Sequence, residues 1–274
     1  MEKTDDIGLG SVQKTLLLPL WGRAKETQKQ TPLLIDKTAV EVTKALNYDF
    51  SLMSEHIGKL IQYGWIARSL YFDGKIRSFI QQFPEATVVN IGCGLDTTFF
   101  RVDNGSIQWI DIDLPDVIAL RRKYIPESIR NRFIAKSVTD KSWYESIYQK
   151  DHVMLLIAGV LYYFDKDRIK QLFSDFRTHH PGVEVVFDYA SKLGIKISNK
   201  KVLKDGGMDK SACLIWGINN IYEIEKWGCG IEVIDCIPMY QDHKWHFPLM
   251  DRIAMKICDT IKFMSFAHVR IHAT

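Results

Sequence analysis

The sequence has few of the features that mark disulfide-rich, membrane-spanning or nucleic-acid-binding proteins. Its five cysteines are an odd number and form no Cys-x-x-Cys pair, which argues against a disulfide framework and a zinc cluster. The longest uncharged apolar stretch, Val153 to Phe164, is too short to cross a bilayer as a helix. Lys and Arg number 36 against 33 Asp and Glu, so the basic excess typical of a dedicated nucleic-acid binder is missing.

The N-terminal segment, Met1 to Asp6, has no cationic start followed by an apolar stretch, so we expect no secretion signal. These absences together predict a cytoplasmic protein with no membrane partner and no nucleic-acid partner. The 46% hydrophobic content is typical of a folded globular protein and excludes disorder as the main state. The sequence gives no indication of an oligomeric state.

Short apolar runs alternate with amphipathic segments after Pro84. The expected strands are Thr87–Ile91, Ile107–Ile112, Phe133–Ala135, His152–Ala158 and Val183–Phe187. The expected helices between them are Asp96–Val102, Pro115–Tyr124, Asp140–Gln149 and Lys166–Arg177. Continuous apolar strands joined by helical crossovers predict an α/β fold with a doubly wound, mostly parallel sheet. Strand character at Ile231–Met239 and Lys262–His272, around a helix near Pro248–Cys258, predicts a late antiparallel pair at the sheet edge.

The chain divides into two expected regions. Residues 1–85 have apolar residues at helical spacing and predict a helical N-terminal cover, with helices over Asp36–Leu46 and Ile57–Phe83. Asp36 is expected to cap the first of these helices. Residues 86–274 form the α/β domain, with an insertion at about 190–220. Six lysines and three glycines between Lys192 and Lys210 predict that this insertion is exposed and is a candidate mobile lid.

Two glycines, Gly92 and Gly94, follow directly after the first expected strand. Glycines at this place let the backbone approach a ligand closely, and the helix that follows offers unpaired N–H groups. Thr97 stands where a dinucleotide-binding fingerprint has its third glycine, which favours a nucleoside ligand without pyrophosphate, such as S-adenosylmethionine. A plain tight turn is the alternative reading of the two glycines.

Acidic residues lie close to this turn in the predicted fold. The second strand ends in Asp111 and Asp113, about 20 residues after the glycines, where a carboxylate can accept hydrogen bonds from both ribose hydroxyls. The alternative is that one of the two only caps the helix at Pro115. Asp96, which follows the glycines directly, is a candidate ligand or a helix N-cap.

Five segments spread over nearly the whole chain then carry a family resemblance. They are Thr15–Ala24, Ile66–Asp73, Val89–Arg101, Trp109–Pro115 and Gly159–Phe164. In this order they resemble the leucine carboxyl methyltransferase superfamily, in particular its members related to tetracenomycin polyketide O-methyltransferases. The resemblance implies a class I S-adenosylmethionine-dependent methyltransferase fold, a Rossmann-like sheet with a helical cover. It also implies S-adenosyl-L-methionine as cofactor and S-adenosyl-L-homocysteine (SAH) as product.

The resemblance further implies roles for individual residues. Arg68 would pair with the carboxylate of the cofactor's methionine part, for which a surface salt bridge is the alternative. Asp113 would bind the ribose hydroxyls, with Asp111 as the substitute, and Lys14 or Arg23 would contact cofactor or substrate. The full set of cofactor-binding candidates is Arg68, Gly92, Cys93, Gly94, Asp96, Asp111, Asp113, Ser137, Val138 and Ala158.

Two departures from the family pattern affect the expected activity. Ser137 and Val138 stand where many members carry Asp-Leu to hold the adenine amino group, and Ala158 stands where many carry Glu. Any contact made by that Glu is missing here. The departures favour small-molecule members over strict leucine carboxyl methyltransferases, and they also motivate a cofactor-binding protein without catalysis.

Catalytic candidates come from residues that can hold or accept a proton near the acceptor. Tyr162 and Tyr163 follow the fourth strand and are expected at the ligand crevice. His243 and His246 are candidate general bases, although a structural role is the better explanation of each. No Cys or carboxylate pair completes a site with these histidines, so we expect no metal.

The sequence therefore predicts an S-adenosylmethionine-dependent O-methyltransferase whose acceptor is a hydroxyl or carboxylate of a small molecule, such as a polyketide-like compound. Three alternatives stay open. They are an S-adenosylmethionine-binding protein without catalysis, a protein C-terminal carboxyl methyltransferase, and a nicotinamide-dependent oxidoreductase, against which Thr97 argues.

Overall fold

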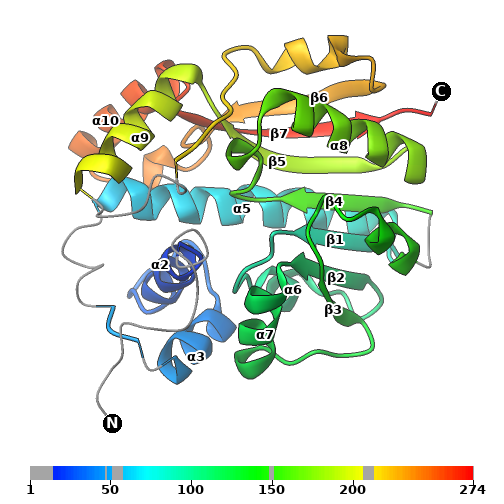
Figure 1. Ribbon diagram of the computed structural model, residues 1–274. Coiled ribbons are helices and arrows are strands. Elements are labelled where there is room, and N and C mark those ends of the chain that lie inside the picture. Colours follow the sequence, from blue (N-terminus) through cyan, green and yellow to red (C-terminus); the bar gives the residue numbers. More distant parts are fainter. Residues whose placement is uncertain (1–14, 47, 51–57, 148–150, 206–212, 274) are drawn as a thin grey trace.

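A seven-stranded sheet forms the centre of the computed structural model, which describes residues 15–46, 48–50, 58–147, 151–205 and 213–273 (Figure 1). The strand order is β3-β2-β1-β4-β5-β7-β6. The strands are β1 Thr87–Ile91, β2 Gln108–Asp113, β3 Asn131–Ala135, β4 Val153–Ile157, β5 Glu184–Ala190, β6 Ile231–Pro238 and β7 Met264–Ile271. The order confirms the predicted doubly wound sheet.

The first five strands pair in parallel, and β7 runs antiparallel between β5 and β6. Every residue of β1, β4 and β5 is buried, because helices cover both faces of the sheet. The predicted late antiparallel pair is confirmed as β6 and β7, with β6 at the edge.

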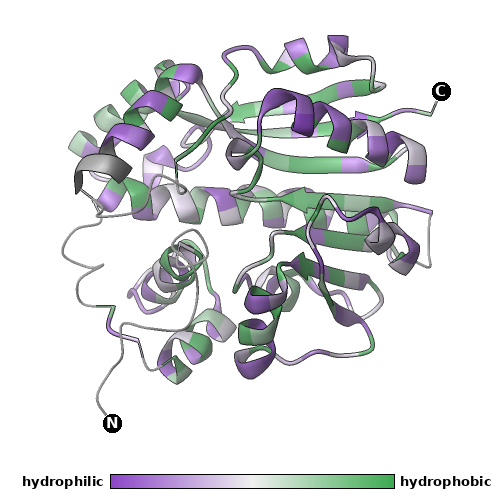
Figure 2. Cartoon of the chain, in the orientation of Figure 1, coloured by the Kyte–Doolittle hydropathy of each residue, from purple (hydrophilic) through white to green (hydrophobic). Residues whose placement is uncertain are grey.

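Helices form a layer on each face of the sheet. The α-helices are α2 Leu17–Thr27, α3 Lys37–Ala45, α5 Lys59–Gln82, α6 Thr98–Val102, α7 Pro115–Tyr124, α8 Lys166–His179, α9 Lys192–Asp205 and α10 Leu249–Thr260. Short 3-10 helices are η1 Lys141–Ser146, η2 Leu161–Tyr163, η4 Ile221–Trp227 and η5 Lys244–His246. The strands are coloured mainly as hydrophobic in Figure 2, whereas α8 mixes both kinds of residue. Among the described residues, no helix is long and apolar enough to cross a membrane.

Two hydrophobic clusters hold the helix layers to the sheet. On one face, Ile76 and Phe79 of α5 pack with Met154 and Phe266 of the strands. On the other face, Phe173 of α8 joins a cluster that contains the inner residues of β1, β2, β4, β5 and β7. The long helix α5 lies along one face of the sheet (Figure 1), and its residues reach from the core to the edge where the parallel strands end.

The N-terminal helices α2 and α3 pack as a pair beside α5 (Figure 1). Leu17 and Leu20 of α2 lie in one cluster with Val42 of α3 and Leu95 of the loop after β1. The predicted N-cap is confirmed, because the Asp36 side chain accepts a hydrogen bond from the backbone of Ala39 at 2.9 Å. The pair α2 and α3, with Thr15 and Leu16 that precede it, is called the cover below. It contacts the loop in which the sequence places the glycine motif.

The helix expected over Asp140–Gln149 is wrong in type, because η1 is a 3-10 helix that ends at Ser146. The Asp140 carboxylate accepts hydrogen bonds from both the backbone N–H and the hydroxyl of Ser142. Such a local side-chain contact competes with the start of an α-helix. Residues 148–150 lie outside the described part of the chain.

The expected insertion is more ordered in its described part than its lysine content suggests. Its first half forms α9, and Asn199 of α9 bonds both the N–H and the carbonyl of Leu214 at 2.8 Å. The backbone N–H groups of Ile215 and Trp216 both donate to the carbonyl of Tyr162. The described insertion is therefore fastened beside η2 rather than left as a free lid.

Gly194 allows α9 to lie against the chain before β7. A Cβ at Gly194 would stand 2.2 Å from the backbone oxygen of Phe263, whereas a Cβ at Gly74 of α5 would meet nothing within 4 Å. We expect Gly194→Ala to lower the free energy of unfolding by about 1–3 kcal/mol through overpacking. Gly74→Ala, the matched control, should raise it by about 0.5–1 kcal/mol because alanine favours helices.

Denaturant-induced unfolding of both variants measures this difference. If Gly194→Ala were as stable as Gly74→Ala, α9 would not lie against Phe263 and the insertion would not be fastened as described.

Candidate active site

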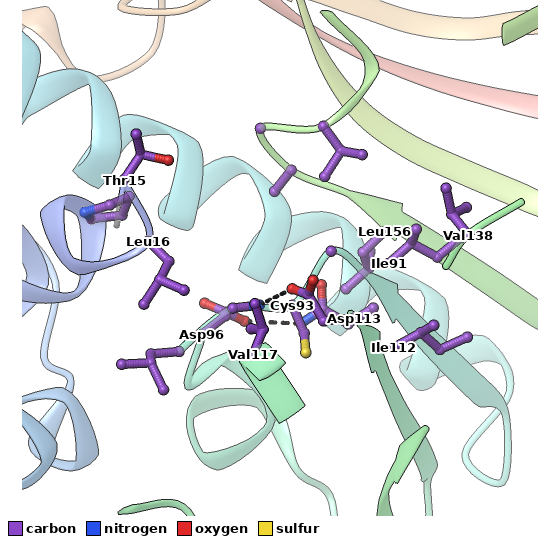
Figure 3. Close-up of a pocket in the computed structure, with 18 of the residues that line it drawn as sticks. Thr15, Leu16, Ile91, Cys93, Asp96, Ile112, Asp113, Val117, Val138 and Leu156 are labelled. Atoms are coloured by element: carbon purple, nitrogen blue, oxygen red, sulfur yellow. Dashed lines mark hydrogen bonds between the residues drawn. The ribbon is translucent and has the colours of Figure 1, made fainter. Parts of the chain in front are cut away.

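A cavity of about 790 Å³ lies where the parallel strands β1, β2 and β4 end. The cover supplies one wall through Thr15 and Leu16, which lie across the cavity from Val138 and Leu156 in Figure 3. Helix α5 supplies a further wall through Trp65, Arg68, Ser69 and Phe72. Ligand sites of doubly wound sheets lie at this edge.

The loop after β1 has the backbone that the glycine motif predicts. Gly92 and Gly94 have φ angles of +68° and +49°, which residues other than glycine rarely adopt. A Cβ at Gly92 would stand 2.3 Å from Cγ2 of Val160, and one at Gly94 would stand 3.1 Å from Cβ of Leu16. Both glycines line the cavity, so their bare backbone forms part of its floor.

Asp113, at the end of β2, also lines the cavity (Figure 3). Its Oδ2 accepts a hydrogen bond from the N–H of Gly94 at 2.7 Å, and its Oδ1 accepts one from the N–H of Leu114 at 2.8 Å. Burial raises the pKa of Asp113 above its ordinary range, although these two donors oppose the change. The carboxylate is therefore fixed in place with its remaining lone pairs available.

Asp111 does not line the cavity, which is a departure from its expected role as substitute ribose ligand. Its side chain is fully buried and lies 2.6 Å from Nη2 of Arg121. It also accepts hydrogen bonds from the Trp109 indole at 2.9 Å and from the Asn90 amide at 3.0 Å. Arg121 in turn donates to the carbonyl of Gly94, so Asp111 supports the glycine loop from behind.

Asp96 lines the cavity and takes part in the charge network that joins the cover to this loop. Its Oδ1 lies 3.7 Å from Nη2 of Arg23, and its Oδ2 accepts a hydrogen bond from the N–H of Thr98. Burial alone would raise the pKa of Asp96, but Arg23, Arg101 and Thr98 together lower it to about 2. Asp96 is thus ionised at neutral pH and is a weak base.

Arg68 points from α5 into the cavity and pairs with a residue that the sequence reading missed. Its Nη1 lies 3.0 Å from Oδ2 of Asp188, which is fully buried on β5. Tyr162 donates its hydroxyl to the same carboxylate at 3.1 Å, and the N–H of Gly159 donates to Oδ1 at 2.7 Å. Asp188 directly follows the expected strand Val183–Phe187, as Asp113 directly follows the expected strand Ile107–Ile112. Its position after a strand could therefore have identified it as a candidate.

The remaining cofactor-binding candidates also reach the cavity. Cys93 is buried in the glycine loop, and burial raises its pKa well above the ordinary value, so it stays a neutral thiol. Ser137, Val138 and Ala158 also line the cavity, and the Ser137 hydroxyl lies 3.0 Å from that of Thr139.

Not every candidate is brought to the cavity. Tyr162 and Tyr163 line it, but His243 and His246 belong to the segment around η5 and do not. Arg23 lines it, while Lys14 lies outside the described residues. In the part of the chain that the structure describes, no group of three or more His, Cys, Asp or Glu could hold a metal ion.

Comparisons with known proteins agree on one family. The model of the family described as leucine carboxyl methyltransferase matches residues 17–177. The tetracenomycin polyketide synthesis O-methyltransferase TcmP of Streptomyces glaucescens is 30% identical over 223 residues, which cover 81% of this chain and 80% of that protein. The S-adenosyl-L-methionine-dependent methyltransferase dpfgK of Gibberella zeae is 25% identical over 217 residues, 70% of this chain and 71% of that protein.

A solved structure agrees in fold. The magnesium protoporphyrin IX methyltransferase of Synechocystis PCC 6803, determined with bound SAH, superposes with a TM-score of 0.50 at 10% identity. The match covers 86% of this chain and 100% of that one. These comparisons confirm the family resemblance and the class I methyltransferase fold expected from the sequence.

Proposed function

This chain belongs to the leucine carboxyl methyltransferase family and is an S-adenosylmethionine-dependent methyltransferase, and we propose that it methylates an already ionised oxygen of a small molecule. The proposal rests on one observation: the described residues that line the cavity include no well-suited general base. Among the described residues that line it there is no histidine. An acceptor oxygen that has already lost its proton when it binds needs no such base.

The lining groups that could act as a base are poorly suited to the task. Burial raises the pKa of both Tyr162 and Tyr163, so these phenols stay protonated at neutral pH. Asp96, with a pKa of about 2, is too weak a base to deprotonate an alcohol. Asp113 is held by the N–H groups of Gly94 and Leu114, and we assign its remaining lone pairs to the ribose hydroxyls rather than to the acceptor. A carboxylate, or a phenol acidic enough to be ionised at neutral pH, fits these conditions.

The residues at the cavity fit the cofactor by their chemistry. Arg68 offers a guanidinium to the carboxylate of the methionine part, and Asp113 offers a carboxylate to the ribose hydroxyls. Gly92 and Gly94 have positive φ angles and line the cavity with bare backbone, and Ser137 and Val138 would flank the adenine. When bound, the cofactor supplies a methyl group that is already activated for in-line displacement.

The protein then contributes to the reaction by positioning the acceptor against the cofactor and by excluding water. Leu18 and Pro19 of the cover and Trp65 and Phe72 of α5 give the cavity apolar lining. An aromatic or polycyclic acid would bury its rings against this lining and direct its oxygen toward the glycine loop. We therefore propose an aromatic carboxylic acid or acidic phenol as the acceptor.

Turnover of an acceptor panel with S-adenosylmethionine, followed by SAH release, tests this proposal. We expect aromatic carboxylates and acidic phenols to be methylated and aliphatic alcohols of similar size to be inert. For two phenols of different pKa, the rise of kcat/KM with pH should follow the pKa of each phenol. Methylation of the alcohols would contradict the proposal, because it would mean that the enzyme has a general base. Methylation only of peptides that end in a free carboxylate would mean that the acceptor is a protein and not a small molecule.

A further inference from the structure

Asp188 is a buried carboxylate that the reaction as proposed does not use. It lies near the end of β5, with no exposed side-chain surface, and does not itself line the cavity. Its two oxygens accept three hydrogen bonds, from Arg68 of α5, from Tyr162 of η2 and from the N–H of Gly159. A buried charge is costly unless it is paired, so this arrangement calls for a role.

Arg68 is the partner through which Asp188 reaches the cavity. The Arg68 side chain is 16% exposed, and its Nη1 is held by Asp188 while the side chain lines the cavity. A guanidinium has five N–H donors in a rigid fork, so one edge can bind Asp188 while the other binds a second carboxylate. A long side chain held in this way loses less conformational freedom when a ligand binds.

The neighbouring glycine leaves room for the pair. Gly159 has a φ angle of +79°, and a Cβ there would stand 3.2 Å from Nη1 of Arg68 and 3.5 Å from the hydroxyl of Tyr162. The same residue donates its N–H to Asp188. The turn after β4 thus both holds the carboxylate and leaves space for the guanidinium.

We propose that Asp188 is the positioning residue for the amino-acid end of the cofactor and that it acts by holding Arg68. The inference rests on the proposed function, because it requires Arg68 to bind the cofactor's carboxylate. An Asn side chain at this position has one acceptor oxygen where Asp188 has two, so it cannot accept from all three donors. Its NH2 group would face either Arg68 and Tyr162 or the N–H of Gly159. Arg68 would then lose its fixed orientation.

The test compares two ligands that differ only in the amino-acid end. SAH has it, and 5′-methylthioadenosine, which shares the adenosine and the sulfur, lacks it. By titration calorimetry, Asp188→Asn should weaken SAH binding at least tenfold and change the affinity for 5′-methylthioadenosine less than threefold. Combined with Arg68→Ala, Asp188→Asn should cause no further loss of SAH affinity, because the group on which it acts is gone.

Glu184→Gln is the matched control. Glu184 lies on the same strand and is paired through both oxygens, with His268 and Arg270, each at 2.7 Å. It does not line the cavity. The variant loses a comparable paired charge of β5, so it should bind both ligands as the unmodified enzyme does. Arg68→Lys serves as a second variant, since it keeps a positive charge beside Asp188 and is expected to fold. It should bind SAH at least tenfold more weakly, because a compact ammonium on a shorter side chain lacks the planar fork whose two edges can each hold a carboxylate.

Each other result decides against the inference. Equal loss of both ligands in Asp188→Asn would make Asp188 a structural residue of the whole site, and unchanged or tighter SAH binding would show that it does not position Arg68. Full SAH affinity in Arg68→Lys would remove the need for a bridging fork. If Arg68→Ala itself binds SAH normally, the proposed cofactor contact is wrong, which separates that failure from a failure of Asp188 alone.

Discussion

Asp36→Ala is expected to lower the free energy of unfolding by about 3–5 kcal/mol, because it leaves buried arginines without their common partner. Oδ2 of Asp36 lies 2.9 Å from Nε of Arg23 and 2.6 Å from Nη1 of Arg101, and both arginine side chains are 5% exposed. The hydroxyl of Thr97 donates to the same oxygen at 2.5 Å. Oδ1 caps α3, which adds about 1 kcal/mol to the loss.

The loss should extend from the cover to the cavity. Arg23, freed from Asp36, is also the group that donates to the carbonyl of Leu95 and lies beside Asp96 in the loop after β1. We therefore expect Asp36→Ala to weaken SAH binding as well as folding.

Denaturant unfolding and calorimetric titration of the same preparation measure both effects. Asp103→Ala is the matched control, because Asp103 pairs with Arg130 at the surface and surface pairs contribute little. It should leave both measurements almost unchanged. An Asp36→Ala protein as stable as the Asp103→Ala protein would mean that the network does not hold the cover to the sheet.

The sheet and the glycine loop were predictable because each depends on local sequence. Strands buried on both faces have continuous apolar runs, and a turn that needs positive φ angles requires glycine, as at Gly92 and Gly94. The carboxylate of Asp113 comes at the end of such a run, so its place at the ligand edge follows from the strand that precedes it. These parts of the site need no knowledge of distant contacts.

Other parts could not be predicted because they depend on partners far apart in the sequence. Arg121 stands in a basic run, Arg121 to Lys123, that is typical of a solvated helix face, yet its side chain is 1% exposed and paired with Asp111. Asp188 and Arg68 are 120 residues apart, and the packing of α5 against the sheet brings them together. The sequence likewise could not show that His243 lies away from the cavity, because its position depends on how distant segments pack.

Asp111 and Asp113 give the sharpest test of the site, since the sequence offered both as ribose ligands. Asp111→Asn should lower the free energy of unfolding by about 3–5 kcal/mol, because Arg121 would stay buried with its charge unpaired. Asp113→Asn should fold with near-normal stability, since the partners of Asp113 among the described residues are backbone donors and an amide oxygen can still accept one of them. Its affinity for SAH should fall at least tenfold, about 1.4 kcal/mol, as the ribose loses an ionised acceptor.

Asp111→Asn is therefore expected to lose stability, whereas Asp113→Asn is expected to lose SAH affinity. Measuring stability and affinity in both proteins distinguishes the two roles. A small loss of SAH affinity in Asp111→Asn is compatible with the structure, because Arg121 also holds the carbonyls of Gly94 and Asp96. A stable Asp111→Asn protein that no longer binds SAH would contradict it, since Asp111 would then be the ribose ligand. Normal SAH affinity in Asp113→Asn would likewise remove Asp113 from the cofactor site and leave the glycine loop and Arg68 to hold the ligand.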